Sequence, residues 1–130
     1  MKHLMILIFS ISLLTSCASQ KNTKKASKEK PVRIANEELE YEIIIFDIGF
    51  ESYLRTIAKP EGYYSESYLE NKNKFYVNTW NTRALNPLNY DSSIYENTID
   101  YSSDIHYGLE VNYKLYNYFK FVEYKYKEKF

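Results

Sequence analysis

The residues best suited to chemistry in this chain lie in one short polar stretch, DYSSDIHYG, at residues 100–108. Asp100, Asp104 and His106 offer two carboxylates and an imidazole, which could supply part of a zinc or similar site if another segment completed the ligand set. A loop in which Asp104 forms a turn and a backbone group binds His106 explains the same residues, and that is the commoner arrangement. We therefore treat the three residues as a candidate polar site and predict no metal and no cofactor.

Other catalytic arrangements are weakly supported. No serine lies in a G-x-S-x-G turn and there are only two histidines, which argues against nucleophilic hydrolysis. Glycoside cleavage needs two carboxylates that face each other at about 5 to 10 Å. Candidates for such a pair are Glu66, Glu70, Asp91, Glu96 and Asp100. Their spacing does not place any two across a cleft, so a small enzyme acting on glycans or peptides is the alternative hypothesis and a non-enzymatic module is the main one.

Aromatic side chains are the other candidate for recognition. The chain has 15 Tyr, 7 Phe and one Trp in 130 residues. Several tyrosines fall outside the apolar stripes of the expected helices: Tyr63, Tyr64, Tyr68, Tyr113, Tyr116 and Tyr124. Tyrosine often recognises protein partners, and its flat ring also suits the apolar face of a sugar. Tyrosine equally serves to fill the core and boundary of a small domain. We expect some of these rings to reach solvent and form a candidate binding surface.

The amino terminus has the layout of an export signal. Lys2 and His3 precede an apolar run, residues 4–14, that is about half the roughly 20 residues needed to cross a membrane. The next residues, Leu14-Thr15-Ser16-Cys17, resemble the bacterial lipobox. That resemblance implies cleavage before Cys17 and acylation of its thiol. The alternative is that Cys17 is a small apolar residue in a signal that is cleaved elsewhere.

The lipobox reading implies a place in the cell. Residues 1–16 would be a lipoprotein signal peptide, and acyl chains on Cys17 would hold the protein on a membrane of the bacterial envelope. Ala18 and Ser19, with no aspartate beside Cys17, resemble the pattern of lipoproteins sent to the outer membrane. Such an anchored module could bind another envelope protein or polymer.

Charge divides the chain into a basic linker and an acidic body. Residues 1–36 hold seven basic residues and one acidic residue, a net +6, whereas the remainder holds ten basic and sixteen acidic residues, a net −6. The polar segment that follows Cys17 predicts a flexible linker over residues 18–36. Residues 37–130 then form one small globular domain. An acidic body behind an export signal is not expected to bind nucleic acid.

Periodicity predicts the elements of that domain. Residues 41–47, YEIIIFD, form a near-continuous apolar strand, which we expect to be buried on both faces. Helical spacing follows over residues 50–58, 65–85 and 108–126, with Ser65 or Ser67 as the cap of the second helix. The alternation in residues 94–99 predicts a half-exposed strand that could pair with the first. The expected fold is a small α+β domain with about three helices packed on a two-stranded sheet.

Three stretches together carry a resemblance to a known family: YEIIIFDIGFESYL, YYSESYLENKNKFYVNTWNTRALNP and IHYGLEVNYKLYNYFKFVEYKY. They are similar to a family of small bacterial lipoproteins classed as a domain of unknown function. The similarity runs over residues 41–126. It implies no known activity, substrate or cofactor.

Overall fold

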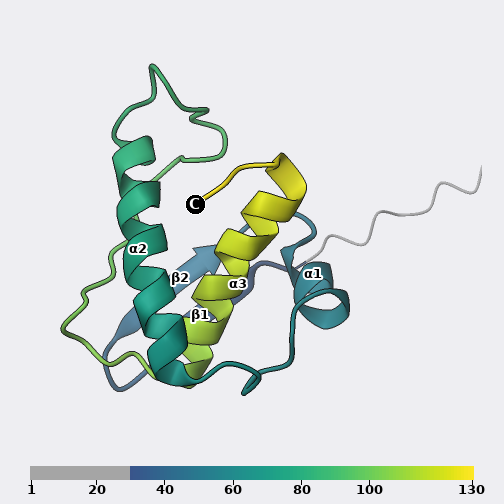
Figure 1. The fold of residues 1–130 in the computed structure, drawn as a ribbon, viewed down its shortest axis with the longest axis vertical. Coiled ribbons are helices and arrows are strands. Elements are labelled where there is room, and N and C mark those ends of the chain that lie inside the picture. The colour runs from purple at the N-terminus through teal and green to yellow at the C-terminus, as the bar shows by residue number, and fades with distance from the viewer. Residues whose placement is uncertain (1–29) are drawn as a thin grey trace, which may run out of the picture.

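The structure, a computed structural model of the chain, describes residues 30–130. Its elements, in chain order, are β1 (Val32–Asn36), β2 (Tyr41–Ile45), α1 (Phe50–Thr56), α2 (Glu66–Ala84) and α3 (Leu109–Tyr126) (Figure 1). This confirms the predicted α+β domain with three helices and a two-stranded sheet. The predicted signal peptide, the lipobox residues and residues 18–29 of the linker lie outside the described residues.

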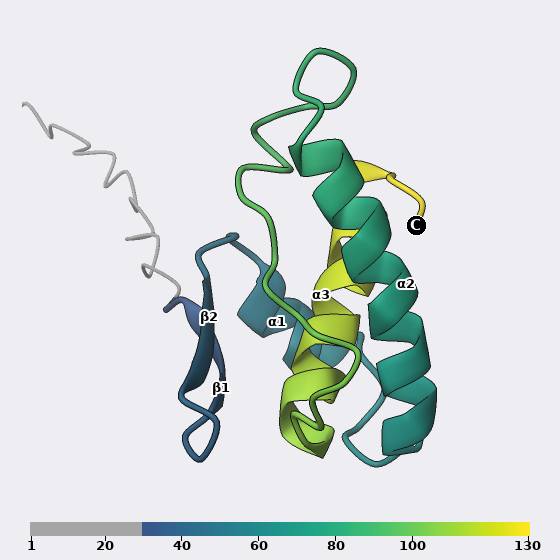
Figure 2. The same cartoon turned by 90° about the vertical axis from the view of Figure 1, so that its left-hand side faces the viewer.

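The two strands form an antiparallel hairpin, with Val32 opposite Ile45 and Asn36 opposite Tyr41. Burial alternates along both strands, because the helices lie on only one side of the hairpin (Figure 2). Ile34 and Ile45 face the core, whereas Ile44 is exposed. The expectation that residues 41–47 are buried on both faces is therefore wrong.

β1 lies inside the range that the sequence assigns to the linker. Its central residue, Ile34, is fully buried, and its neighbours alternate in burial as a half-covered strand requires. Lys114 of α3 also donates a hydrogen bond to the carbonyl oxygen of Arg33, at 3.1 Å. The prediction that the linker extends to residue 36 is thus wrong for these five residues, and the domain begins before residue 37.

Residues 94–99 do not form the second strand that their alternation predicts. They cross α2 as an irregular segment whose backbone is held by side chains of that helix. Trp80 Nε1 donates to the Asn97 carbonyl at 2.8 Å, and the Asn81 amide both donates to the Ile99 carbonyl at 2.9 Å and accepts from its N–H at 2.7 Å. These side chains satisfy the groups that a partner strand would otherwise bind.

α3 is the central element of the domain, since it contacts α2, α1 and β1. Its predicted apolar stripe is confirmed: Val111, Leu115, Phe119 and Val122 are all buried. Aromatic rings fill much of the space around them, and the Trp80 ring lies 5.6 Å from Tyr118 and 6.0 Å from Phe119. No helix within residues 30–130 is both long enough and apolar enough to cross a membrane.

Candidate functional site

The predicted polar site does not come together as a metal centre. His106 is exposed and its Nδ1 lies 3.0 Å from Oε1 of Glu70, a residue at the start of α2. Asp104 is exposed and its backbone N–H donates to the Ser102 hydroxyl at 3.3 Å. Residues 30–130 contain no group of three or more His, Cys, Asp or Glu side chains placed to hold a metal ion. Asp100, Asp104 and His106 are therefore not assembled into a ligand set.

The contact between His106 and Glu70 could not be predicted from the sequence, because 36 residues separate them. Only the packing of α2 against the start of α3 brings them together. The pair joins residue 106, just before α3, to the first turns of α2. The contact is therefore best explained as a surface interaction that connects the segment before α3 to α2.

The acidic residues that could serve a glycosidase are spread over two regions. Glu66 and Glu70 lie in the first turns of α2, and Asp91 accepts hydrogen bonds from the N–H and hydroxyl of Ser93, which lower the pKa of its carboxyl. Glu96 and Asp100 line a common groove beside β2, and both are exposed. An acid–base pair needs at least one carboxyl shielded from water, so the exposure of both argues against Glu96 and Asp100 as such a pair.

Four of the candidate tyrosines gather into one cluster, which we call the tyrosine surface: Tyr63, Tyr64, Tyr68 and Tyr116. The rings of Tyr64 and Tyr68 are stacked with their centroids 4.7 Å apart, and Tyr63 meets Tyr64 edge to face at 4.8 Å. Tyr63 and Tyr68 are 59% and 39% exposed, so the outer rings of the cluster reach solvent. The outer rings therefore offer apolar ring surface together with hydroxyl groups to a ligand.

Tyr116 and Tyr113 of α3 support this surface without forming its outer part. Tyr116, which the sequence places among the candidate surface tyrosines, is only 6% exposed and is not one of the rings that reach solvent. Its ring lies 5.5 Å from Tyr64, and burial together with the neighbouring Tyr64 raises the pKa of its hydroxyl. Tyr113 is half-buried and donates a hydrogen bond to the Lys59 carbonyl at 2.7 Å, which holds the segment after α1.

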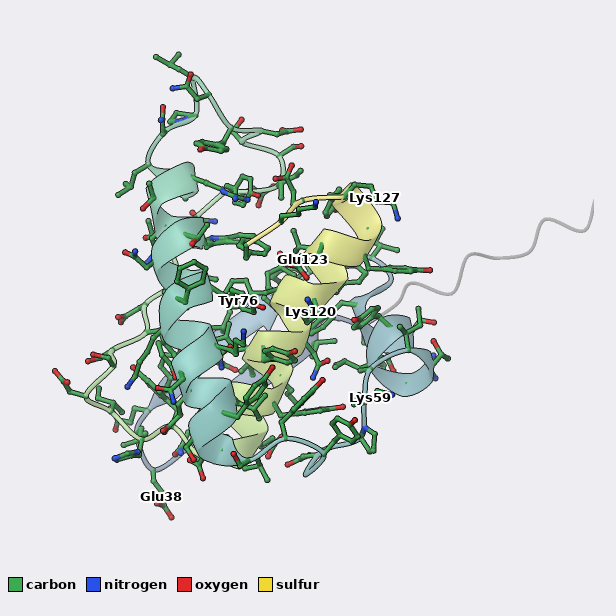
Figure 3. All side chains as sticks on the ribbon, in the orientation of Figure 1. Glu38, Lys59, Tyr76, Lys120, Glu123 and Lys127 are labelled. Atoms are coloured by element: carbon green, nitrogen blue, oxygen red, sulfur yellow. The ribbon has the colours of Figure 1, made fainter. Side chains whose placement is uncertain are left out.

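Two lysines that sequence reasoning missed border the tyrosine surface. Lys59 Nζ lies 5.3 Å from the centre of the Tyr63 ring, and Lys72 Nζ lies 5.8 Å from that of Tyr68. Tyr68 and Lys72 are four residues apart on one helix, a spacing from which their contact could have been predicted. Lys59 could not have been found this way, because the loop before α2 decides its position (Figure 3).

Side chains of α2 and α3 also meet on the face shown in Figure 3. Tyr76 points from α2 toward Lys120 and Glu123 of α3, which form an ion pair with each other. Burial is the main cause that raises the pKa of the Tyr76 hydroxyl; Lys120 opposes the rise and Glu123 adds to it. The ion pair lies within α3, beside Tyr76 of α2.

The described chain also contains a groove of about 840 Å³ that the sequence did not predict. One side is β2 with the residues that flank it, and the other is the segment 93–100. Trp80 and Tyr118 are buried and line it from the core side. The groove exists because residues 94–99 bind α2 and leave β2 without a second partner strand.

Comparison with known proteins identifies a family and no activity. No curated protein and no solved structure matches the chain. A family model does match, over residues 4–130, and its description is a family of unknown function, DUF6146. The match includes the whole folded domain and most of the amino-terminal segment. The chain belongs to this family of unknown function, DUF6146.

Proposed function

We propose that the protein is a bacterial envelope lipoprotein, anchored by acyl chains on Cys17, whose folded domain binds an envelope glycan without converting it. The observation that carries the binding role is the cluster in which Tyr64 stacks on Tyr68 and Tyr63 meets Tyr64 edge to face, with Tyr63 and Tyr68 exposed. Rings that are stacked on one another and packed against Tyr116 lose little conformational freedom when a ligand docks. The flanking Lys59 and Lys72 suit a polymer that carries carboxylates or phosphates.

The anchor is supported by the order of features at the amino terminus: basic residues, a short apolar run, and Leu14-Thr15-Ser16-Cys17. Two or three acyl chains would hold a domain of this size on a membrane far more firmly than one. An outer-membrane location follows from the residues after Cys17 and is part of the proposal.

Metabolic labelling with radioactive palmitate tests the anchor. Wild-type protein should carry label and fractionate with membranes, whereas Cys17→Ala should carry none and should accumulate as the uncleaved precursor. Cys17 is the only cysteine in the chain, so no second thiol can take up the label. Equal label on the two proteins would refute the lipoprotein assignment.

Co-sedimentation with purified peptidoglycan sacculi tests the binding role. Tyr63→Ala should reduce the bound fraction several-fold, since an exposed aromatic ring contributes roughly 1 kcal/mol or more to such contacts. Tyr124→Ala is the matched control, because Tyr124 is 55% exposed against 59% for Tyr63 and lies in α3 outside the tyrosine surface. If both variants sediment like wild type, the tyrosine surface is not the glycan site.

A further inference from the structure

The outer edge of β2 is an unoccupied pairing site. β2 is hydrogen-bonded to β1 along one edge, and the sheet of the described chain has no third strand. In an antiparallel pair, half of the backbone N–H and C=O groups of each strand point away from the partner. No backbone or side-chain hydrogen bond within residues 30–130 reaches the backbone of residues 41–45 from that second edge. These groups are available to another strand.

The groove beside this edge leaves room for such a strand. Its two sides are joined near the start of β2, where the Tyr41 hydroxyl donates to the Asp100 carbonyl at 2.7 Å. This contact is made by a side chain, and no backbone hydrogen bond joins residues 41–45 to residues 93–100. Beyond the other end of β2, Lys125 and Tyr126 both bind Asp47 and tie the strand's exit to α3. The groove is thus held open along β2.

One tyrosine hydroxyl in the groove forms no hydrogen bond with the rest of the described chain. Tyr118 is 7% exposed and lines the groove, yet its hydroxyl forms no hydrogen bond within the described part of the chain. Asn73 Oδ1 is the one fully enclosed side-chain polar atom without a partner among residues 30–130, so the Tyr118 hydroxyl is reached from the groove and could donate to a ligand carbonyl there. Ile45 and Ile99 line the same space and offer apolar contacts.

The charges around the groove define the occupant. Glu40, Glu96 and Asp100 line it and take part in no ion pair among residues 30–130. The groove's lining includes one cation, Lys125, which is already paired with Asp47. The unpaired charge of the lining is therefore negative, and it favours a partner that carries lysine or arginine.

We infer that this groove receives an extended, basic segment of another polypeptide, which adds to β2 as a third strand. Main-chain hydrogen bonds to β2 would supply much of the affinity, and the alternation of apolar and basic side chains would supply the specificity. Apolar residues would face Ile45 and Ile99, and basic residues would face Glu96 and Asp100. This site is separate from the tyrosine surface and does not depend on the anchor at Cys17.

The test uses the full-length chain in detergent and a fluorescent peptide in which valine and lysine alternate. The matched control peptide keeps the lysines and replaces every second valine by proline, which removes backbone donors and prevents strand pairing. We expect saturable binding of the first peptide and at least roughly tenfold weaker binding of the second. Equal binding of both peptides would overturn the proposal, since simple charge attraction would then explain the result.

Variants locate the site. The double variant Glu96→Lys and Asp100→Lys should weaken binding roughly tenfold, because it reverses two exposed charges on the groove. Glu38→Lys and Asp104→Lys are the controls: both residues are exposed acids outside the groove, and Glu38 lies in the hairpin turn (Figure 3). If the controls weaken binding as much as the double variant does, the groove is not the site.

Hydrogen exchange distinguishes strand addition from other binding. Amides of residues 41–45 on the outer edge should exchange readily in the free protein and become protected when the valine–lysine peptide is bound. Protection elsewhere, with none in β2, would contradict the proposal even if the peptide binds. A dimer that protects the same amides without peptide would replace the proposed partner by a second copy of the chain. The results of these peptide experiments are independent of the palmitate-labelling and sacculus-binding experiments, so this proposal can fail while the proposed function stands.

Discussion

Arg83 joins the end of α2 to the segment that follows α3. Its guanidinium donates to the Tyr95 hydroxyl at 2.7 Å, to Glu128 at 3.2 Å and to the Lys129 carbonyl. Its central carbon also lies 5.1 Å from the centre of the Phe130 ring. The last turn of α2 thereby holds the segment after α3, and Phe130 stays packed 5.2 Å from Phe119.

Arg83→Lys should lower the free energy of unfolding by about 1 to 3 kcal/mol, because a single ammonium cannot make these diverging hydrogen bonds or stack as a plane. Arg55→Lys on α1 is the matched control, since Arg55 is exposed and lies in the last turn of its own helix. Urea unfolding of both variants measures the difference. Equal losses would show that the interactions of Arg83 are not stabilising.

Buried amides form a second residue-scale feature. Asn73 of α2 and Asn112 of α3 are fully buried, and Asn73 Nδ2 donates to the carbonyl and side-chain oxygens of Asn112 at 2.9 and 3.1 Å. Tyr101 donates to the same side-chain oxygen at 2.7 Å. This network fixes the register between α2 and α3, because a slip of either helix would leave buried amides unpaired.

At the scale of elements, the hairpin depends on its first strand. β1 supplies Ile34, which is fully buried, and its contacts with α3 attach the whole sheet to the helices. β2 pairs only with β1 within the described sheet. A single strand with no partner cannot satisfy its backbone groups in a half-buried position.

A chain of residues 37–130 should therefore be much less stable than a chain of residues 30–130, although it keeps all three helices. The loss of Ile34 alone should cost about 2 to 5 kcal/mol, as buried aliphatic deletions do. Urea unfolding followed by circular dichroism compares the two chains. Equal unfolding midpoints would mean that β1 is not part of the stable domain.

The residues that begin α2 and α1 explain where these two helices start. Ser65 and Ser67 were both possible caps of the second helix, and the structure places Ser65 at the cap, where its hydroxyl accepts the Tyr68 N–H at 3.2 Å. Gly49 comes directly before the first residue of α1, and its own φ is 101°. Residues that carry a Cβ rarely adopt this conformation. This glycine turns the chain from β2 into α1.

At the scale of the whole molecule, several tyrosines are buried in or packed against the core, and their hydroxyls make the stability depend on pH. Burial raises the pKa of the hydroxyls of Tyr41, Tyr101, Tyr116 and Tyr118 above the ordinary value of 10.0. The neutral hydroxyl is the form that the folded state favours. Unfolding therefore releases protons at alkaline pH, and the folded state loses stability there.

The contribution of these tyrosines to the free energy of unfolding should stay constant up to about pH 9. It should fall as the pH rises above about 10. Urea unfolding at a series of pH values measures this. Tyr118→Phe should make the alkaline decline shallower, because it removes one hydroxyl whose pKa is raised. A stability that does not change across this range would show that the buried hydroxyls ionise as easily as exposed ones.

The helices of this protein could be predicted from sequence because their information is local. Apolar spacing in α3 and the serine before α2 act within a few residues, and the structure confirms both elements. β1 was not predicted because VRIAN is short and follows a lysine-rich segment. The polar composition of that segment suggested a linker, although apolar and polar residues alternate in VRIAN. Residues 94–99 have the alternation of a strand, but the side chains of Trp80 and Asn81 bind their backbone first.

The sequence by itself determined the α+β class, the extent of the three helices and membership of an uncharacterised family, because periodic burial and chain-long similarity need no knowledge of distant contacts. The anchor at Cys17 is likewise an inference from sequence and remains a proposal. Only the tertiary structure decided that Tyr64 and Tyr68 pack edge to face against Tyr116 of α3 and that a groove lies open along β2. Both features join segments far apart in the chain, and such contacts depend on how whole elements pack.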